Sequence, residues 1–177
     1  MSRKFLEASK IYLRPLSLED AKSNYVNWLN DEEVCKYNAH HRFVNTEEKT
    51  REYIQSINSS KNNLVLAICS KEDDKHIGNV SIQNINYIDS NAEFAIIMGE
   101  KDYHGKGLAY EASKLIIDHA FNSLNLHRIY CGTSEKNISM QKLATKLNMK
   151  KEGVLKEAIF KEGSYLDIVL YGLIKDT

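Results

Sequence analysis

Two closely spaced glycines between an apolar segment and an amphipathic segment are the feature that most limits what this chain can fold into. Residues 92–98 are apolar enough for a buried β-strand, and residues 108–124 carry apolar side chains at helical spacing. Gly105 and Gly107 lack Cβ atoms and can take positive φ, so backbone N–H groups can approach a ligand there. The helix start adds free amides and a partial positive charge. The unit therefore predicts a site for an anion, and we expect a pyrophosphate, although a Gly-x-Gly turn also occurs in ordinary strand-to-helix connections.

Apolar periodicity along the rest of the chain predicts a mixed α/β protein of the α+β kind. The expected order is a strand, two helices, three strands, a helix, a strand, a helix and two strands. The strands are expected at residues 11–14, 64–69, 77–85, 92–98 and 128–133, with two more around residues 161–164. The helices are expected at residues 21–29, 46–57 and 108–124 and from about residue 138. No repeat or linker interrupts the pattern, so we expect residues 1–177 to form a single domain.

Composition narrows the classes of function. With 24 Lys and Arg against 24 Asp and Glu, the formal net charge is zero, which argues against a broad nucleic-acid footprint and against electrostatic docking on anionic membranes. Cys35, Cys69 and Cys131 are odd in number, far apart and beside apolar runs, so we expect buried thiols and no disulfide framework. The start lacks a signal-peptide core and no later apolar run is long enough to span a membrane, which predicts a cytoplasmic protein.

The glycine segment His104-Gly105-Lys106-Gly107-Leu108-Ala109 resembles the Gln/Arg-x-x-Gly-x-Gly/Ala pattern of the GNAT acyltransferase superfamily, with His in the first place. Further segments follow in the order of the branch that holds ribosomal-protein N-terminal and spermidine acetyltransferases. They are residues 11–16, 27–31, 76–79, Asn137, residues 152–157 and residues 165–167. The resemblance covers nearly the whole chain. It implies a single mixed, mostly antiparallel sheet, splayed at the acyl-CoA site and flanked by helices, in a protein that could form a homodimer or a larger homo-oligomer.

The resemblance also implies how acetyl-CoA would bind as co-substrate. The pantetheine arm would lie in the opening between the strands at residues 92–98 and 128–133, paired with backbone groups of Ile96, Ile97 and Met98. The N–H of Ile97 or Met98 would polarise the thioester carbonyl. The residues expected to surround the phosphates are His104, Gly105, Lys106, Gly107, Leu108, Ala109 and Tyr110. Asn137 matches an Asn that the family places against the pantetheine or phosphate end, but Asn is also a favoured helix N-cap.

Glu93 is the candidate general base. It is the one carboxylate in the apolar strand at residues 92–98, where partial burial would make it a better acceptor of an ammonium proton, directly or through water. The alternative is a surface Glu bonded to a neighbouring strand. Many GNAT enzymes have a Tyr at the place of Ala144 that protonates the leaving thiolate, so another group or solvent would do so here. We expect no metal site, because the adjacent His40 and His41 point in different directions in extended chain.

These features together predict transfer of an acetyl group from acetyl-CoA to a primary amine by direct attack in a ternary complex. Acceptor choice is expected at residues 30–45 and in the C-terminal hairpin. Asp31, Glu32 and Glu33 favour a polyamine, whereas Arg42, Tyr37 and His41 favour a nucleotide-linked amino sugar. A peptide N-terminus is the third acceptor class. The alternative from another class of function is a non-catalytic acyl-CoA-binding module for sensing or assembly. The charged run at residues 71–75 is expected to be a solvated hairpin turn without a binding role.

Overall fold

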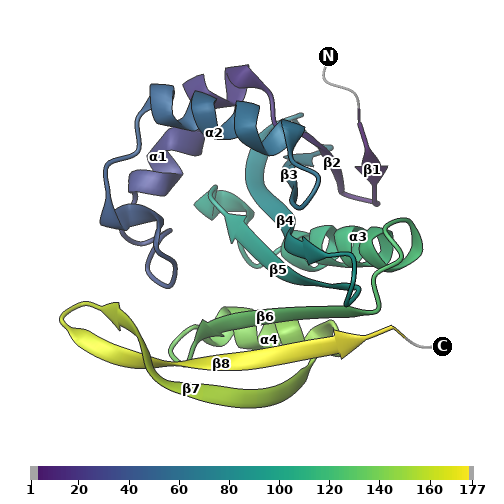
Figure 1. The fold of residues 1–177 in the computed structure, drawn as a ribbon. Helices are drawn as coiled ribbons and strands as arrows, with labels where there is room; N and C mark the ends of the chain where they lie inside the picture. Colours follow the sequence, from purple (N-terminus) through teal and green to yellow (C-terminus); the bar gives the residue numbers. More distant parts are fainter. Residues whose placement is uncertain (1–3, 176–177) are drawn as a thin grey trace.

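Eight strands form one continuous sheet in the computed structural model, which describes residues 4–175. Their spatial order is β1-β2-β3-β4-β5-β6-β8-β7, and every neighbouring pair is antiparallel except β5 and β6 (Figure 1). The strands are β1 (Leu6–Glu7), β2 (Ile11–Pro15), β3 (Leu64–Ser70), β4 (His76–Asn86), β5 (Asn91–Met98), β6 (Arg128–Ser134), β7 (Lys150–Lys161) and β8 (Ser164–Ile174).

Helices cover both faces of the sheet. They are α1 (Asn24–Asn30), α2 (Glu47–Ser59), α3 (Leu108–Asn122) and α4 (Ile138–Lys146), with short 3₁₀ helices at Leu18–Lys22, His40–Arg42 and Lys101–Tyr103. Figure 1 places α1 and α2 together on one side of β2–β5, and α3 on the other side. α4 packs beside the half of the sheet that holds β6, β8 and β7.

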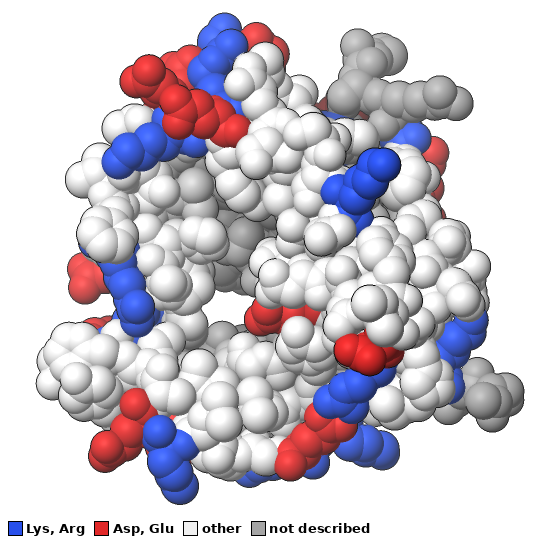
Figure 2. Space-filling view, viewed as in Figure 1, with Lys and Arg blue, Asp and Glu red and all other residues white. Residues whose placement is uncertain are grey.

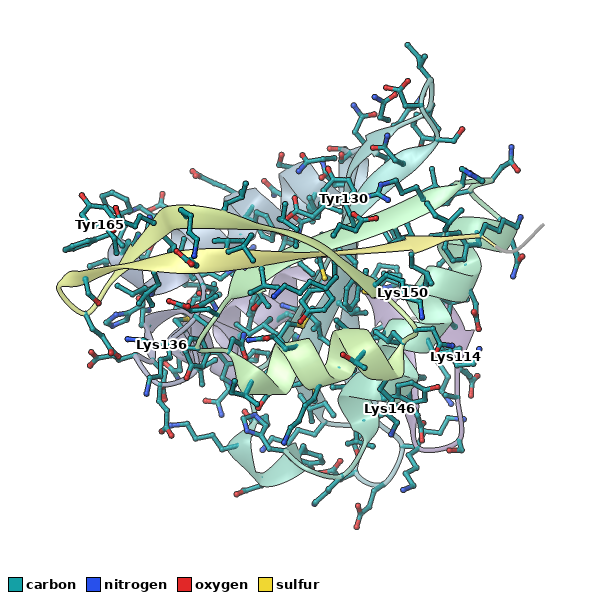
Figure 3. The ribbon with its side chains drawn as sticks, turned by 90° about the horizontal axis from the view of Figure 1, so that it is seen from below. Lys114, Tyr130, Lys136, Lys146, Lys150 and Tyr165 are labelled. Atoms are coloured by element: carbon teal, nitrogen blue, oxygen red, sulfur yellow. The ribbon has the colours of Figure 1, made fainter. Side chains whose placement is uncertain are left out.

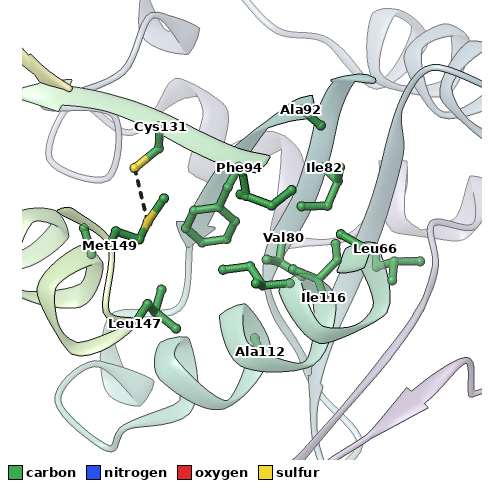
Figure 4. Close-up of a cluster of buried hydrophobic side chains, with 14 of the residues drawn as sticks. Leu66, Val80, Ile82, Ala92, Phe94, Ala112, Ile116, Cys131, Leu147 and Met149 are labelled. Carbon is green, nitrogen blue, oxygen red and sulfur yellow. Dashed lines mark hydrogen bonds between the residues drawn. The ribbon is translucent and has the colours of Figure 1, made fainter. Parts of the chain in front are cut away.

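The larger core lies between α3 and the sheet (Figure 4). Phe94 of β5 and Ile116 of α3 are fully buried there, and the small Ala112 lets the helix approach the strands closely. The Sγ atom of Cys131 lies 3.8 Å from the Sδ atom of Met149 in the same cluster. Cys35, Cys69 and Cys131 are all buried and free, which confirms the expectation for the thiols.

β5 and β6 separate after a short paired stretch, which opens the sheet. Their parallel register runs from Asn91 with Arg128 to Glu93 with Tyr130 and then stops. β5 nevertheless continues to Met98 beside β4, and β6 continues to Ser134 beside β8. Each strand is therefore held from its outer side while its inner edge faces an opening. This splayed sheet is the architecture that the family resemblance implies.

The predicted order of elements is confirmed, and the differences from it have local causes. The helix expected at residues 21–29 is interrupted. A capping box between Ser17 and Asp20 opens the 3₁₀ helix, and Ser23 in extended conformation then caps α1 by accepting from the N–H of Tyr25. The helix expected to reach residue 124 ends at Asn122. The sequence analysis missed β1, which is two residues long and too short to show a period.

Candidate active site

A cleft of about 470 Å³ occupies the opening between β5 and β6. It extends from the glycine loop before α3, along β5, to the start of α4 and to the loop after α1. The lining residues are Val34, Tyr37, Asn38, Glu93, Phe94, Ala95, Ile96, Ile97, Met98, Tyr103, His104, Gly105, Gly107, Leu108, Ala109, Gly132, Thr133, Asn137, Ser139, Met140 and Leu143. Ten of the twelve predicted site residues are thereby brought together, while Lys106 and Tyr110 lie outside the lining.

The glycine loop has the geometry of an anion cradle. Gly105 and Gly107 have φ of 74° and 80°, and a Cβ atom built on either would meet no other atom within 4 Å. Positive φ there requires glycine for conformational reasons, and open space lies beside both residues. Within residues 4–175, no hydrogen bond uses the backbone N–H of any residue from 105 to 109. The loop thus offers unused donors at a helix start, as a pyrophosphate would need.

His104, at the first place of the loop, contacts the carbonyl end of β5. Its Nε2 atom lies 3.0 Å from the carbonyl oxygen of Met98. Because that oxygen can only accept, Nε2 carries the proton in this contact. The contact holds the loop against the last residue of the strand whose backbone faces the cleft.

Lys106 and Tyr110 were expected to surround the phosphates, but neither lines the cleft, and each takes part in a contact between a cation and an aromatic ring. The Nζ atom of Lys106 lies 4.9 Å from the ring centroid of Tyr103, and the Nζ atom of Lys146 lies 4.4 Å from that of Tyr110. These are cation–π distances. Sequence spacing could not predict that the side chains of Lys106 and Tyr110 lie outside the cleft lining, because in such a loop only the backbone is constrained to face a phosphate.

Glu93 lies at the vertex of the splay, where the last pair between β5 and β6 forms. Alternation along β5 puts it with Ala95 and Ile97 on the face covered by α1 and α2, and the side chain is partly buried. One carboxylate oxygen, Oε2, accepts a hydrogen bond of 3.0 Å from Nδ2 of Asn84 on β4. Glu93 is therefore bonded to a neighbouring strand and also lines the cleft.

Asn84 reaches Glu93 because of a β-bulge that the sequence did not reveal. The register between β4 and β5 shifts between Gln83 and Asn86, and Asn84 takes a left-handed conformation with φ of 52°. Its backbone N–H donates to Oδ1 of Asn63 at 3.1 Å, which ties the bulge to the loop after α2. An Asn in a strand pattern is the one sequence signal that could have indicated this irregularity.

Asn137 is the N-cap of α4, and its Oδ1 atom accepts from the N–H of Met140 at 3.2 Å. It also lines the cleft. Ala144 is fully buried on the same helix. No hydroxyl is present at that place, and the α4 residues that line the cleft are Ser139, Met140 and Leu143.

The charged turn between β3 and β4 contacts the segment that leads into the glycine loop. Nζ of Lys75 lies 2.5 Å from Oε2 of Glu100, and the Tyr103 hydroxyl donates to the Asp73 carboxylate. Glu100 is buried, which pushes its pKa up, but hydrogen bonds from Lys75, Asn24 and Trp28 outweigh burial and leave the pKa below its ordinary value. The expected hairpin turn is present, but its side chains bind the neighbouring loop in addition to facing solvent.

Between residues 4 and 175, no group of three or more His, Cys, Asp or Glu side chains is placed to hold a metal ion. In the same part of the chain, no helix combines the length and apolar character needed to cross a membrane.

A family model described as an acetyltransferase (GNAT) domain matches residues 10–150. The chain belongs to the GNAT acetyltransferase family and is an N-acetyltransferase. It is 32% identical over 175 residues to an uncharacterized N-acetyltransferase, p20, of Bacillus licheniformis, covering 96% of each chain. It is 31% identical over 163 residues to spermidine N(1)-acetyltransferase of Escherichia coli K12, covering 92% of this chain and 84% of the relative.

Solved structures agree with this assignment. The fold is similar to spermidine N-acetyltransferase from Vibrio cholerae in complex with CoA and spermine, with a TM-score of 0.85, 25% identity and coverage of 94% and 96%. It also matches the fold of the microcin C7 self-immunity acetyltransferase in complex with acetyl-CoA and AMP, with a TM-score of 0.83, 24% identity and coverage of 95% and 94%.

Proposed function

We propose that this chain transfers the acetyl group of acetyl-CoA to a primary amine, with Glu93 as general base. The observation that carries the proposal is the position of Glu93. A half-buried carboxylate stands at the vertex of the same cleft whose other end is the glycine loop. In this proposal, the nucleophile is deprotonated at one end of the opening and the anion binds at the other, which suits acyl transfer from a long phosphorylated thioester.

The chain's own groups have distinct roles in this proposal. Backbone N–H groups of residues 105–109 bind the pyrophosphate, and the free inner edge of β5 at Ile96, Ile97 and Met98 pairs with the pantetheine amides. The backbone N–H of Ile97 or Met98 polarises the thioester carbonyl. Asn137, which already caps α4, presents its remaining polar atoms to the cleft.

The reaction balances without a covalent enzyme intermediate. The neutral amine attacks the thioester carbonyl, a C–N bond forms, and the C–S bond breaks. Glu93 accepts the proton from the ammonium form of the amine through its carboxylate, directly or through water. The nitrogen of the tetrahedral adduct then releases its second proton to solvent, and the CoA thiolate takes a proton from solvent or another group, because Ala144 offers no acidic hydrogen.

Thiol release from acetyl-CoA tests the proposal, with spermidine, an amino-sugar nucleotide and a short peptide as acceptors. We expect saturable turnover of one class, and Glu93→Gln should lower kcat by about 10²- to 10⁴-fold at neutral pH while the KM for acetyl-CoA is retained. Glu48→Gln, on the exposed face of α2, is the matched control. Full activity of Glu93→Gln would exclude this base.

The same measurement addresses the alternative of a non-catalytic acyl-CoA-binding module. Stabilisation by acetyl-CoA without turnover of any amine would favour that module. The expected cytoplasmic location, the single-domain organisation of residues 1–177 and a homodimer or larger homo-oligomer remain predictions beside this proposal.

A further inference from the structure

The acidic residues that favoured a polyamine acceptor are partly neutralised. Asp31 and Glu33 both pair with Lys101, at 3.1 and 2.7 Å between Nζ and the carboxylate oxygens. Asp31 additionally accepts from the backbone N–H groups of Glu33 and Val34. Lys101 thus cancels one of the three negative charges that follow α1.

A second cavity of about 430 Å³ lies on the other side of the same loop, against the tip of the β7–β8 hairpin. Its residues are Glu32, Lys36, His41, Arg42, Phe160, Lys161 and Glu162. Val34, Tyr37 and Asn38 of this loop line the main cleft, so the loop at residues 32–42 is a wall shared by both cavities. Figure 2 shows an opening between the part of the molecule that holds this loop and the hairpin, with Lys or Arg atoms at its margin.

The cations of the second cavity are held by neutral partners. A guanidinium N–H of Arg42 donates to the carbonyl oxygen of Phe160 at 3.1 Å, and Nζ of Lys161 donates to that of Cys35 at 3.0 Å. A carbonyl fixes such a group without cancelling its charge, and both side chains keep further N–H donors. For the residues described here, no ion pair joins Lys36, Arg42 or Lys161 to Glu32 or Glu162.

An exposed aromatic ring lines the same cavity as these cations. Phe160 lines the cavity with 51% of its surface exposed, and its ring centroid lies 5.0 Å from that of Tyr165. An exposed ring beside anchored cations suits a planar base that is linked to phosphate groups.

We propose that the acceptor is an amine linked to a nucleoside phosphate, whose phosphate groups bind Lys36, Arg42 and Lys161 in the second cavity. The amine then lies near Glu93 in the main cleft. This inference rests on the proposed function and specifies its acceptor. It disfavours the polyamine, because the second cavity is lined by three cations, Lys36, Arg42 and Lys161, against two carboxylates, Glu32 and Glu162.

Steady-state kinetics at saturating acetyl-CoA tests this proposal, with four acceptors: an amino-sugar nucleotide with a free amine, the same sugar as its 1-phosphate, the free amino sugar, and spermidine. We expect kcat/KM to be highest for the nucleotide and lower for the sugar phosphate, and inorganic pyrophosphate should compete with the acceptor. Raising the ionic strength should raise the KM of the nucleotide. A higher kcat/KM for the sugar phosphate than for the nucleotide would support the proposed phosphate contacts but would show that the nucleobase does not contribute to binding.

Charge variants give the decisive comparison. Arg42→Gln combined with Lys36→Gln should raise the KM of the nucleotide by about tenfold or more, with kcat and the KM for acetyl-CoA retained. Glu162→Gln should lower that KM. Lys114→Gln is the matched control, because Lys114 pairs with Asp118 on α3, far from Tyr165 at the hairpin tip (Figure 3).

Two results would overturn the inference while leaving the proposed function standing. These are spermidine as the best acceptor, or unchanged nucleotide kinetics in the Arg42 and Lys36 double variant. Absence of turnover with every amine, despite acetyl-CoA binding, would instead contradict the proposed function itself.

Discussion

At the scale of single residues, a substitution of Gly107 would introduce conformational strain without a steric clash. Its φ is 80° and a Cβ atom there would meet no other atom, so replacement costs only the left-handed conformation. Gly107→Ala should cost about 1–2 kcal/mol of local strain and raise the KM for acetyl-CoA. Gly163→Ala is the control, with φ of 75° and equally open space at the β7–β8 turn. Equal KM values in the two variants would show that the loop binds no phosphate.

We expect Asn84 to position Glu93, and the test is a comparison of kcat with KM. The Asn84 amide donates to the Glu93 carboxylate at 3.0 Å and so fixes the direction of that side chain. Asn84→Ala should lower kcat by about tenfold while the KM for acetyl-CoA is retained. Asn86→Ala removes a bond to Asp89 in the same hairpin and should leave kcat unchanged. An unchanged kcat in Asn84→Ala would limit Asn84 to a structural role.

At the same scale, the sequence predicts the cleft residues that lie in one contiguous segment, but not those that tertiary contacts bring in. The glycines and Glu93 were identifiable because strand, turn and helix are contiguous. Asn84 was not, because its role depends on a bulge and on the neighbouring strand. Tyr103 lines the cleft as well, although only its position beside the loop pointed to it.

At the scale of elements, the β3–β4 turn supports the glycine loop. Tyr103→Phe removes the hydrogen bond to Asp73 and should raise the KM for acetyl-CoA severalfold without changing the acceptor KM, because the loop loses a fixed point. Tyr87→Phe loses a comparable bond, to the carbonyl of Lys61, away from the cleft. Identical kinetics for Tyr103→Phe and the unmodified enzyme would argue that the turn has no part in binding.

The junction of β2 with the first 3₁₀ helix depends on a buried ion pair. Arg14 donates to both oxygens of Asp20 at 2.7 Å. Burial pushes the pKa of Asp20 up, but Arg14, His76 and the backbone of Ser17 hold it well below the ordinary range. Asp20→Asn should lower the free energy of unfolding by about 3 kcal/mol at pH 7.

The sign of the pH dependence follows from that depressed pKa. The pair contributes fully above the unfolded-state pKa of about 3.9, and the contribution is lost as pH falls toward the folded-state value. The difference in Tm between the unmodified chain and Asp20→Asn should therefore shrink below about pH 4. Asp118→Asn, at an exposed pair on α3, is the control and should change Tm little. A Tm difference between the unmodified chain and Asp20→Asn that grows as the pH falls would contradict the stabilising role of this ion pair.

These contacts also explain which elements the sequence could predict. Long periodic segments such as α3 and β5 were identified with nearly correct ends. The break in the helix at Ser23 was not predicted. Asp20 contacts Arg14 of β2 and His76 of β4, and such long-range contacts leave no periodic pattern in the sequence.

At the scale of the whole molecule, the strand pairing that joins the two parts of the sheet within residues 4–175 runs from Asn91 to Glu93, next to backbone hydrogen bonds from His127 and Arg128 to Ser90. A ligand in the cleft that contacts both parts should stabilise them together. Acetyl-CoA at about 100 times its Kd should raise the free energy of unfolding by about 2.7 kcal/mol. Hydrogen exchange should show protection along residues 94–98 as well as in the glycine loop. Protection confined to the loop would contradict binding along β5.

The point where β5 and β6 stop pairing also limits the length of what can enter. Met98 lies five positions after Glu93 along the strand, a distance of about 17 Å in extended conformation. A thioester entering from the glycine loop meets a closed sheet at the Glu93–Tyr130 pair, so no space continues beyond it in the plane of the strands. We therefore expect the closed part of the sheet to limit the length of the acyl group. In the proposed binding mode, a longer acyl chain would have to turn toward the acceptor side and compete with the amine for space.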